Sequence, residues 1–74
     1  MDVATSETAE DAMVAAERAA LLSALLDRLE PHRRAAVVAY ELDGLAMVEV
    51  AAAQRIPLNT AWNRLRLGRE DLRA

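Results

Sequence analysis

The sequence predicts a single all-α domain, because alanine dominates its apolar residues, leucines recur at helical spacing, and turn-forming residues divide it into four segments. Alanine has the highest helix propensity of all residues and is the main contributor to an apolar content of 54%. A chain of 74 residues has room for one small domain with a thin core. Residues 1–7 lack apolar periodicity and are expected to form a flexible lead-in, so the folded domain is predicted to span residues 8–74.

The first predicted helix begins at a cap formed by Ser6 or Thr8 and runs to Leu29. Four leucines near its end follow the i, i+3, i+4, i+7 spacing of one buried helical face. These are Leu22, Leu25, Leu26 and Leu29. Met13, closer to the start of this helix, is interpreted as a packing residue. Pro31 ends the helix, because proline disfavours the helical conformation in the residue before it.

Three further helices are predicted, over residues 33–42, 46–54 and 58–73. Gly44 stands where a left-handed cap would follow the first of these three, and Pro57 separates the last two. At 100° per residue, a narrow inner stripe of the last helix is apolar or small. It consists of Ala61, Leu65, Gly68 and Leu72. Tyr40 is expected in the core or at its rim, with its hydroxyl group at the surface.

A short helix, a tight turn and a longer arginine-bearing helix over residues 46–73 have the arrangement of a helix-turn-helix motif. The second helix of such a motif lies in the DNA major groove, and small residues let the two helices cross closely. Three consecutive alanines, residues 51–53, are expected at that crossing.

A polar stripe adjoins the inner face of the last helix. It carries Trp62, Arg66, Arg69 and Arg73, with Asn59 close by, Asn63 just beyond and Leu67 farther round on the side expected to be exposed. Arginine can bind phosphate or guanine, and asparagine can bind adenine. The stripe is therefore a candidate DNA-reading surface, and the alternative is an ordinary solvated helix face.

Charge is distributed unevenly along the chain. Residues 1–30 hold seven acidic side chains and two arginines, a balance of −5, whereas residues 51–74 hold five arginines and two acidic side chains, a balance of +3. The net charge of −3 argues mildly against nucleic-acid binding. The basic C-terminal segment can still present a local positive face, and the local charge of a surface decides whether it attracts a polyanion.

Catalysis and cofactor binding are not indicated. The chain has no cysteine and one histidine, His32, too few residues for a thiolate site or a metal site. Its two glycines stand apart, so no phosphate-binding loop is present. No apolar run approaches the ~20 residues that span a bilayer, and no signal-peptide pattern is seen. We therefore expect a cytoplasmic protein that is not an enzyme, does not span a membrane, and needs no cofactor or metal.

Several short motifs follow one another in a characteristic order and spacing. They are Leu29 to Arg34 (LEPHRR), Glu41 to Leu45 (ELDGL), Val50-Ala51, Ile56-Pro57, Thr60, Arg64-Leu65 and Arg69-Glu70. In this order they resemble region 4 of extracytoplasmic-function (ECF) sigma factors, over about residues 20–73. The resemblance implies a four-helix domain of the winged-helix-like DNA-binding superclass, without a wing. It also implies three partners: the promoter −35 element, the β flap of RNA polymerase, and an anti-sigma factor.

The resemblance assigns most DNA contacts to the last helix and adds two basic residues at the start of the second. The candidate DNA-binding residues are Asn59, Thr60, Trp62, Asn63, Arg64, Arg66, Arg69, Arg33 and Arg34. The two arginines of the second helix have a second interpretation, as a solvated pair. A helix start disfavours cations unless a phosphate or an acidic group lies nearby.

This chain departs from the family pattern at important positions. Arg55 stands where glycine is usual, Asn63 where serine is common, and Trp62 and Leu67 where basic residues are common. Trp62 either folds back over the alanine-rich core or stays exposed beside the arginines, where it could touch thymine methyl groups or a protein. These departures keep a second hypothesis open: an interaction module that binds an anti-sigma factor or a polymerase subunit without reading DNA.

Overall fold

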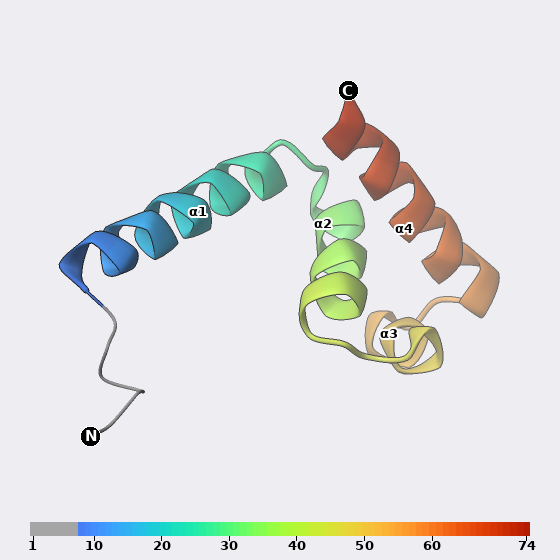
Figure 1. Ribbon diagram of the computed structural model, residues 1–74. Helices are drawn as coiled ribbons and strands as arrows, with labels where there is room; N and C mark the ends of the chain where they lie inside the picture. Colours follow the sequence, from blue (N-terminus) through green and yellow to red (C-terminus); the bar gives the residue numbers. More distant parts are fainter. Residues whose placement is uncertain (1–7) are drawn as a thin grey trace, which may run out of the picture.

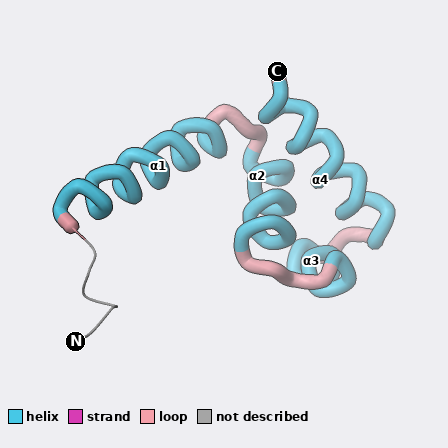
Figure 2. Tube along the Cα trace, in the orientation of Figure 1, coloured by secondary structure: helices cyan, strands magenta, loops and turns pink. Residues whose placement is uncertain are grey.

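The computed structural model describes residues 8–74, and over this range the protein consists of helices joined by short turns (Figures 1 and 2). The elements are α1 (Ala9–Asp27), α2 (Pro31–Val37), the π-helical segment η2 (Val38–Leu42), α3 (Met47–Gln54) and α4 (Leu58–Arg73). No strand occurs among residues 8–74, and the all-α class is confirmed. The flexible lead-in expected over residues 1–7, which includes the candidate cap Ser6, falls outside the described range.

The compact part of the molecule is built from α2, η2, α3 and α4, with α4 lying along α2 and across α3 (Figure 1). Its buried side chains are all apolar among the described residues. They are Leu29, Ala36, Val37, Met47, Val50, Ala51, Ala61 and Leu65. The predicted inner stripe of α4 is confirmed, since Ala61, Leu65 and Gly68 are buried and Leu72 packs against the core.

α1 does not pack as predicted. Leu22 and Leu25 expose 41% and 40% of their surface, and Met13 exposes 65%, so neither the leucine face nor the methionine is buried. α1 ends at Asp27 rather than at residue 29, and the chain then turns sharply, so the helix points away from the compact part (Figure 1). Only Leu29, which is buried, and Leu26, which lies against the core, fulfil the prediction.

The start of α1 is fixed by a reciprocal cap. The Thr8 hydroxyl oxygen accepts a hydrogen bond from the Asp11 amide at 3.1 Å, and the Asp11 carboxylate accepts one from the Thr8 amide at 3.2 Å. This arrangement satisfies two backbone donors that a helix start leaves unpaired. The prediction that Thr8 or Ser6 caps the helix is therefore confirmed for Thr8.

The turn between α1 and α2 is held by Glu30 and Arg34. The Glu30 carboxylate accepts hydrogen bonds from the backbone amides of His32 at 3.0 Å and Arg33 at 3.3 Å. The bond from His32 is the main reason why the pKa of Glu30 lies below its usual range. The Arg34 guanidinium donates to the carbonyl oxygens of Leu26 and Leu29, each at 3.0 Å. These contacts pair backbone carbonyl groups at the end of α1 and backbone amide groups at the start of α2, which helix ends otherwise leave without partners.

Two residues with positive φ direct the chain around α3. Gly44 has φ +72° between η2 and α3, as the sequence predicts for a left-handed cap. Arg55 ends α3 with φ 56° and ψ 48°, which is also the left-handed conformation. A side chain in this conformation is strained, because Cβ approaches the following carbonyl oxygen. Glycine, which lacks Cβ, would adopt it without that strain.

Replacing Arg55 with glycine is expected to stabilise the domain. Relief of the left-handed strain, about 1–2 kcal/mol, exceeds the entropy that glycine adds to the unfolded chain, about 0.4–1 kcal/mol. The urea midpoint of Arg55→Gly, followed by circular dichroism, should rise. Gly44→Ala is the matched control, because nothing lies within 4 Å of the added Cβ and its effect comes from the backbone alone. Its midpoint should fall, and equal midpoints for both variants and the wild type would contradict the account.

Gly68→Ala is expected to destabilise the domain by about 1–3 kcal/mol, the usual cost of overpacking a core. The new Cβ would lie 2.6 Å from Cγ2 of Val37 and 3.3 Å from the carbonyl oxygen of Arg33. The higher helix propensity of alanine, worth about 1 kcal/mol, offsets only part of this cost. Thermal unfolding should show a clear fall in Tm, whereas Arg73→Ala on the exposed side should change it little. A Tm at or above that of the wild type would show that α2 and α4 separate easily.

Candidate nucleic-acid interface

The corner between α3 and α4 decides which side of α4 faces outward. Helices α3 and α4 are in contact, and each contributes a small buried residue to the core, Ala51 at 6% and Ala61 at 0% exposure. Of the three alanines expected at the crossing, Ala52 and Ala53 are in fact exposed, because a crossing on one face of a short helix uses only one residue per turn. With its inner stripe held in the core, α4 turns its polar stripe toward solvent.

The first two turns of α4 carry small polar groups. Asn59 is exposed, and its side-chain oxygen accepts a hydrogen bond from the Thr60 amide at 3.0 Å. Asn63 is also exposed, and its side-chain oxygen accepts one from Nη2 of Arg66 at 2.6 Å. Thr60 is half-buried. The two amide groups therefore stand on the open surface, where a base edge is within reach of such a helix.

Arg64 differs from the other arginines of α4. Its side chain is half-buried and donates from Nη1 to Oε1 of Gln54 at 3.2 Å. Because Gln54 is the last residue of α3, this contact joins the two helices of the helix-turn-helix. Arg64 therefore has a structural role in addition to any role in binding DNA.

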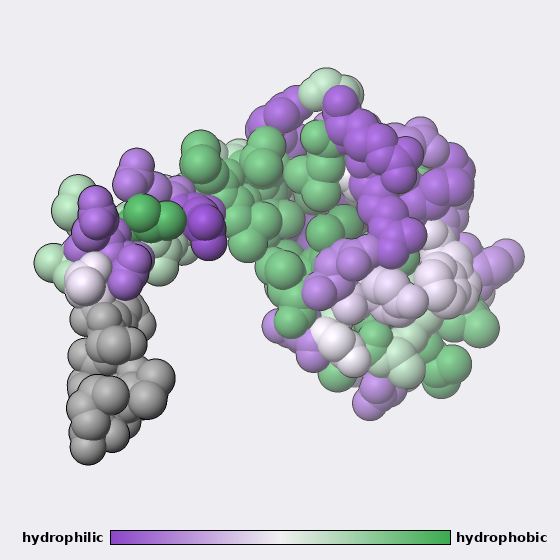
Figure 3. Space-filling model, in the orientation of Figure 1, coloured by the Kyte–Doolittle hydropathy of each residue, from purple (hydrophilic) through white to green (hydrophobic). Residues whose placement is uncertain are grey.

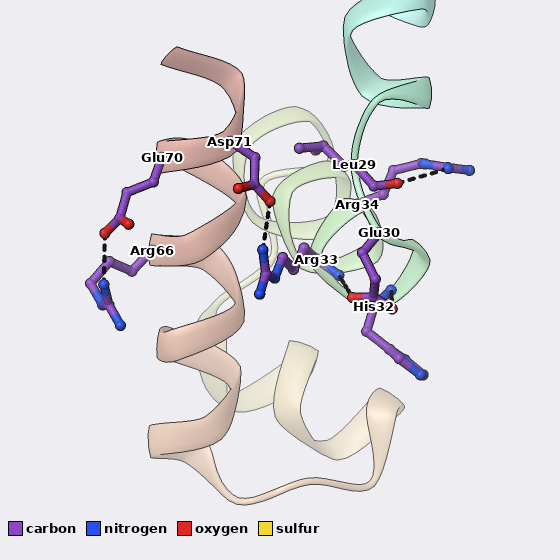
Figure 4. A network of polar contacts seen from close by, with 8 residues as sticks. All are labelled: Leu29, Glu30, His32, Arg33, Arg34, Arg66, Glu70 and Asp71. Carbon is purple, nitrogen blue, oxygen red and sulfur yellow. Dashed lines mark hydrogen bonds and ion pairs between the residues drawn. The ribbon is translucent and has the colours of Figure 1, made fainter. Parts of the chain in front are cut away.

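Two arginines of the stripe are paired with carboxylates. Arg66 contacts Glu70 at 2.6 Å, an i,i+4 pair in which both side chains are more than half exposed (Figure 4). Arg69 pairs with Glu41 of η2, to which its Nε donates at 2.8 Å. Glu41 belongs to the ELDGL motif, but the sequence did not identify it as a partner of Arg69, because a partner 28 residues away leaves no periodic signal. Glu70 does have such a signal, the i,i+4 spacing from Arg66.

Trp62 combines the two interpretations made from the sequence. Its ring meets the Tyr40 ring edge to face, with centroids 5.4 Å apart and an interplanar angle of 65°, yet 44% of its surface is exposed. The Arg69 guanidinium lies over the same Tyr40 ring, 5.8 Å from its centroid. Leu67, expected on the exposed side, is half-buried instead. An open groove of about 310 Å³ runs along the stripe, lined by Trp62, Leu65, Arg66, Arg69, Glu70 and Arg73.

Arg33 and Arg34 are not brought together with this stripe. Arg33 contacts Asp71 of α4 at 2.7 Å, and this hydrogen bond raises its pKa. Figure 4 shows Arg33 and Arg34 on one side of α4 and Arg66 on the other. Arg34 is hydrogen-bonded to the end of α1, and Arg33 and Arg34 are both half-buried. The two arginines therefore do not form the solvated pair that was the alternative from the sequence.

Other kinds of site find no support in the described residues. Within residues 8–74, no three acidic or histidine side chains come together in a way that could hold a metal ion. None of the helices in this range is both long enough and apolar enough to cross a membrane. The feature that the structure does show is the helix-turn-helix of α3 and α4 with arginines on its second helix, an arrangement used by DNA-binding domains.

Comparison with known proteins identifies the family. The family model described as "Sigma-70, region 4" matches residues 19–72. The protein "ECF RNA polymerase sigma factor SigE" of Mycolicibacterium smegmatis is 42% identical over 52 residues, which cover 70% of this chain and 20% of that protein. No solved structure matches significantly. The chain belongs to the sigma-70 region 4 family and is a region 4 domain of the ECF type, and it spans about a fifth of the relative's length.

Membership of this family confirms the resemblance drawn from the motifs, over nearly the same residues. Region 4 is a DNA-binding domain that takes part in promoter recognition, and the family is not one of enzymes.

Proposed function

We propose that this domain recognises the −35 element of a promoter with the exposed stripe of α4, and so helps RNA polymerase begin transcription in the cytoplasm. The observation that supports this most directly is the corner at Ile56 and Pro57, after which α4 leaves both asparagines and all its arginines except Arg64 exposed. The major groove of B-DNA is wide enough to admit an α-helix, and α4 leaves one side exposed along its 16 residues.

The side chains of the stripe suggest a division of roles. Asn59, Asn63 and Arg66 carry the exposed amide and guanidinium groups that can read base edges. Trp62 offers an apolar ring to a thymine methyl group. Thr60 and Arg64, which are half-buried at the start of α4, are better placed for phosphate.

Arg69 lies farther along α4 and is likewise suited to the DNA backbone. Arg33 and Arg34 are engaged inside the domain, so we assign them a contribution through charge rather than through base contacts. The alternative for the whole stripe is an ordinary solvated helix face. Titration with duplex DNA distinguishes that alternative from a DNA-reading surface.

A duplex selected from a random pool for binding at low salt should shift the NMR signals of residues 59–69 in the labelled domain. Arg66→Ala should weaken binding and reduce the slope of log K against log[salt] by about 0.9 for each lost phosphate contact, or relax base preference if Arg66 reads a base. Arg18→Ala on α1 is the matched control and should leave both unchanged. Unshifted signals throughout residues 59–69 at saturating duplex would refute DNA reading by α4.

A second surface supports the interaction with polymerase that the sequence resemblance implies. Five large apolar side chains of α1 are exposed, and three more lie around the turn before α3. They are Met13, Val14, Leu21, Leu22 and Leu25, followed by Leu42, Leu45 and Val48. Figure 3 shows apolar surface running from the C-terminal half of α1 onto the adjoining compact part. We propose that the β flap docks here and that an anti-sigma factor competes for the same surface.

The double substitution Leu22→Glu and Leu25→Glu should weaken binding of a β-flap fragment at least tenfold, because docking would then bury two charges in place of the exposed parts of two leucines. Trp62→Ala is the control and should leave flap binding unchanged while weakening DNA binding. If Trp62→Ala removes flap binding and the leucine substitutions do not, the α4 stripe is a protein-binding surface. That result would favour the interaction module that does not read DNA.

A further inference from the structure

We propose that Glu41 is an internal competitor of DNA phosphate for Arg69, so that the free domain holds Arg69 in an ion pair that DNA must exchange. This inference rests on the proposed reading of DNA by α4. It assigns to η2, which precedes the helix-turn-helix, a part in setting how strongly the stripe binds DNA.

The contact between Glu41 and Arg69 uses the part of the guanidinium that binds anions best. Both Nε and Nη2 of Arg69 donate to the same oxygen, Oε1 of Glu41. This edge of the fork is one that arginine presents to phosphate oxygens and to guanine. While Glu41 occupies it, a phosphate can reach only the remaining donors.

The aromatic neighbours hold Arg69 in place whichever anion it binds. The guanidinium lies 5.8 Å from the Tyr40 ring centroid, and the Tyr40 ring is braced by Trp62 at 5.4 Å. A cation over an aromatic face is attracted to it independently of its anionic partner. Exchange of Glu41 for phosphate therefore needs only a rotation of the glutamate side chain.

The exposure of the pair determines the size of the effect. The side chains of Arg69 and Glu41 are 44% and 40% exposed, so water and salt weaken their attraction. Such a pair opens readily, and Glu41 reduces DNA affinity rather than preventing binding. Arg66 and Glu70 form a still more exposed pair on the same helix, which should give way first.

The test begins with the free protein. The Nε–H proton of Arg69 should exchange with water more slowly than that of Arg73, which is exposed on the same helix and forms no ion pair within residues 8–74. Equal exchange rates would show that the ion pair does not persist in solution. The proposal would then fall without any DNA being added.

The second measurement is DNA binding by Glu41→Gln, which keeps a hydrogen-bond acceptor for Arg69 and removes the charge. Binding of the selected duplex should tighten by up to about fivefold at low salt, the range measured for exposed ion pairs. The slope of log K against log[salt] should become slightly steeper, because the wild-type ion pair that opposes binding is itself weakened by salt and the variant lacks it. The fluorescence of Trp62, the single tryptophan, offers a convenient signal beside the site.

Two controls separate competition at Arg69 from simple repulsion of DNA by a carboxylate. Asp43→Asn removes a charge two residues along the chain, at a residue that forms no ion pair in the described part, and should have a much smaller effect. In an Arg69→Ala background, Glu41→Gln should no longer change the salt slope. If the full effect persists without Arg69, the carboxylate acts at long range and the proposal is overturned.

The outcomes also separate this inference from the proposed function. A wild-type domain that binds duplex normally, with Glu41→Gln unchanged in affinity and slope, refutes the competition alone. A wild-type domain and a Glu41→Gln variant that both leave residues 59–69 unshifted at saturating duplex refute DNA reading itself, and the competition with it.

Discussion

The close approach of α4 to α2 and α3 is the constraint on which the remaining structure depends. Small residues permit it: Ala61 is fully buried in the core, and Gly68 lies against Val37 and the backbone of Arg33 in α2. Because a side chain at Gly68 would clash with α2, the rotation of α4 about its axis is fixed. That rotation decides which side chains face solvent, and so which can meet DNA.

Electrostatics on the outer face of α4 is mostly balanced within the domain. Arg66 and Arg69 each have a carboxylate partner, which agrees with the negative net charge of the chain. A polyanion therefore meets arginines whose charges are partly neutralised, and gains less from them than from free ones. A domain of this kind is suited to modest DNA affinity.

The exposed side of α1 has the opposite character. A helix of 19 residues with no buried side chain is only marginally stable in water by itself, so its reciprocal cap at Thr8 and the bonds to its last carbonyl oxygens matter. Its exposed leucines favour aggregation of an isolated chain, and they offer apolar surface to bury when the domain docks on a partner. The two faces together suit a domain that links DNA to a protein assembly.

Sequence by itself determined the local structure and the family. The bounds of α4 and its inner stripe follow from helical spacing, and Gly44 and Pro57 mark the turns, because these signals act over a few neighbouring residues. The motifs from Leu29 to Glu70 identified region 4 for the same reason, since they record a spacing along one chain. Candidate base-reading residues such as Asn63 and Arg66 could likewise be placed on one face of a helix.

Only the tertiary structure decided which side chains are buried and which arginines are bound to other groups of the domain. Periodicity predicted a buried face on α1, but burial needs a surface to cover it, and the sharp turn after Asp27 carries the helix away from the core. Arg34 was a candidate for DNA and is bound to carbonyl oxygens at the end of α1, while Arg69 is paired with Glu41 across 28 positions. Such contacts depend on distances through space, which residue spacing along a helix does not encode.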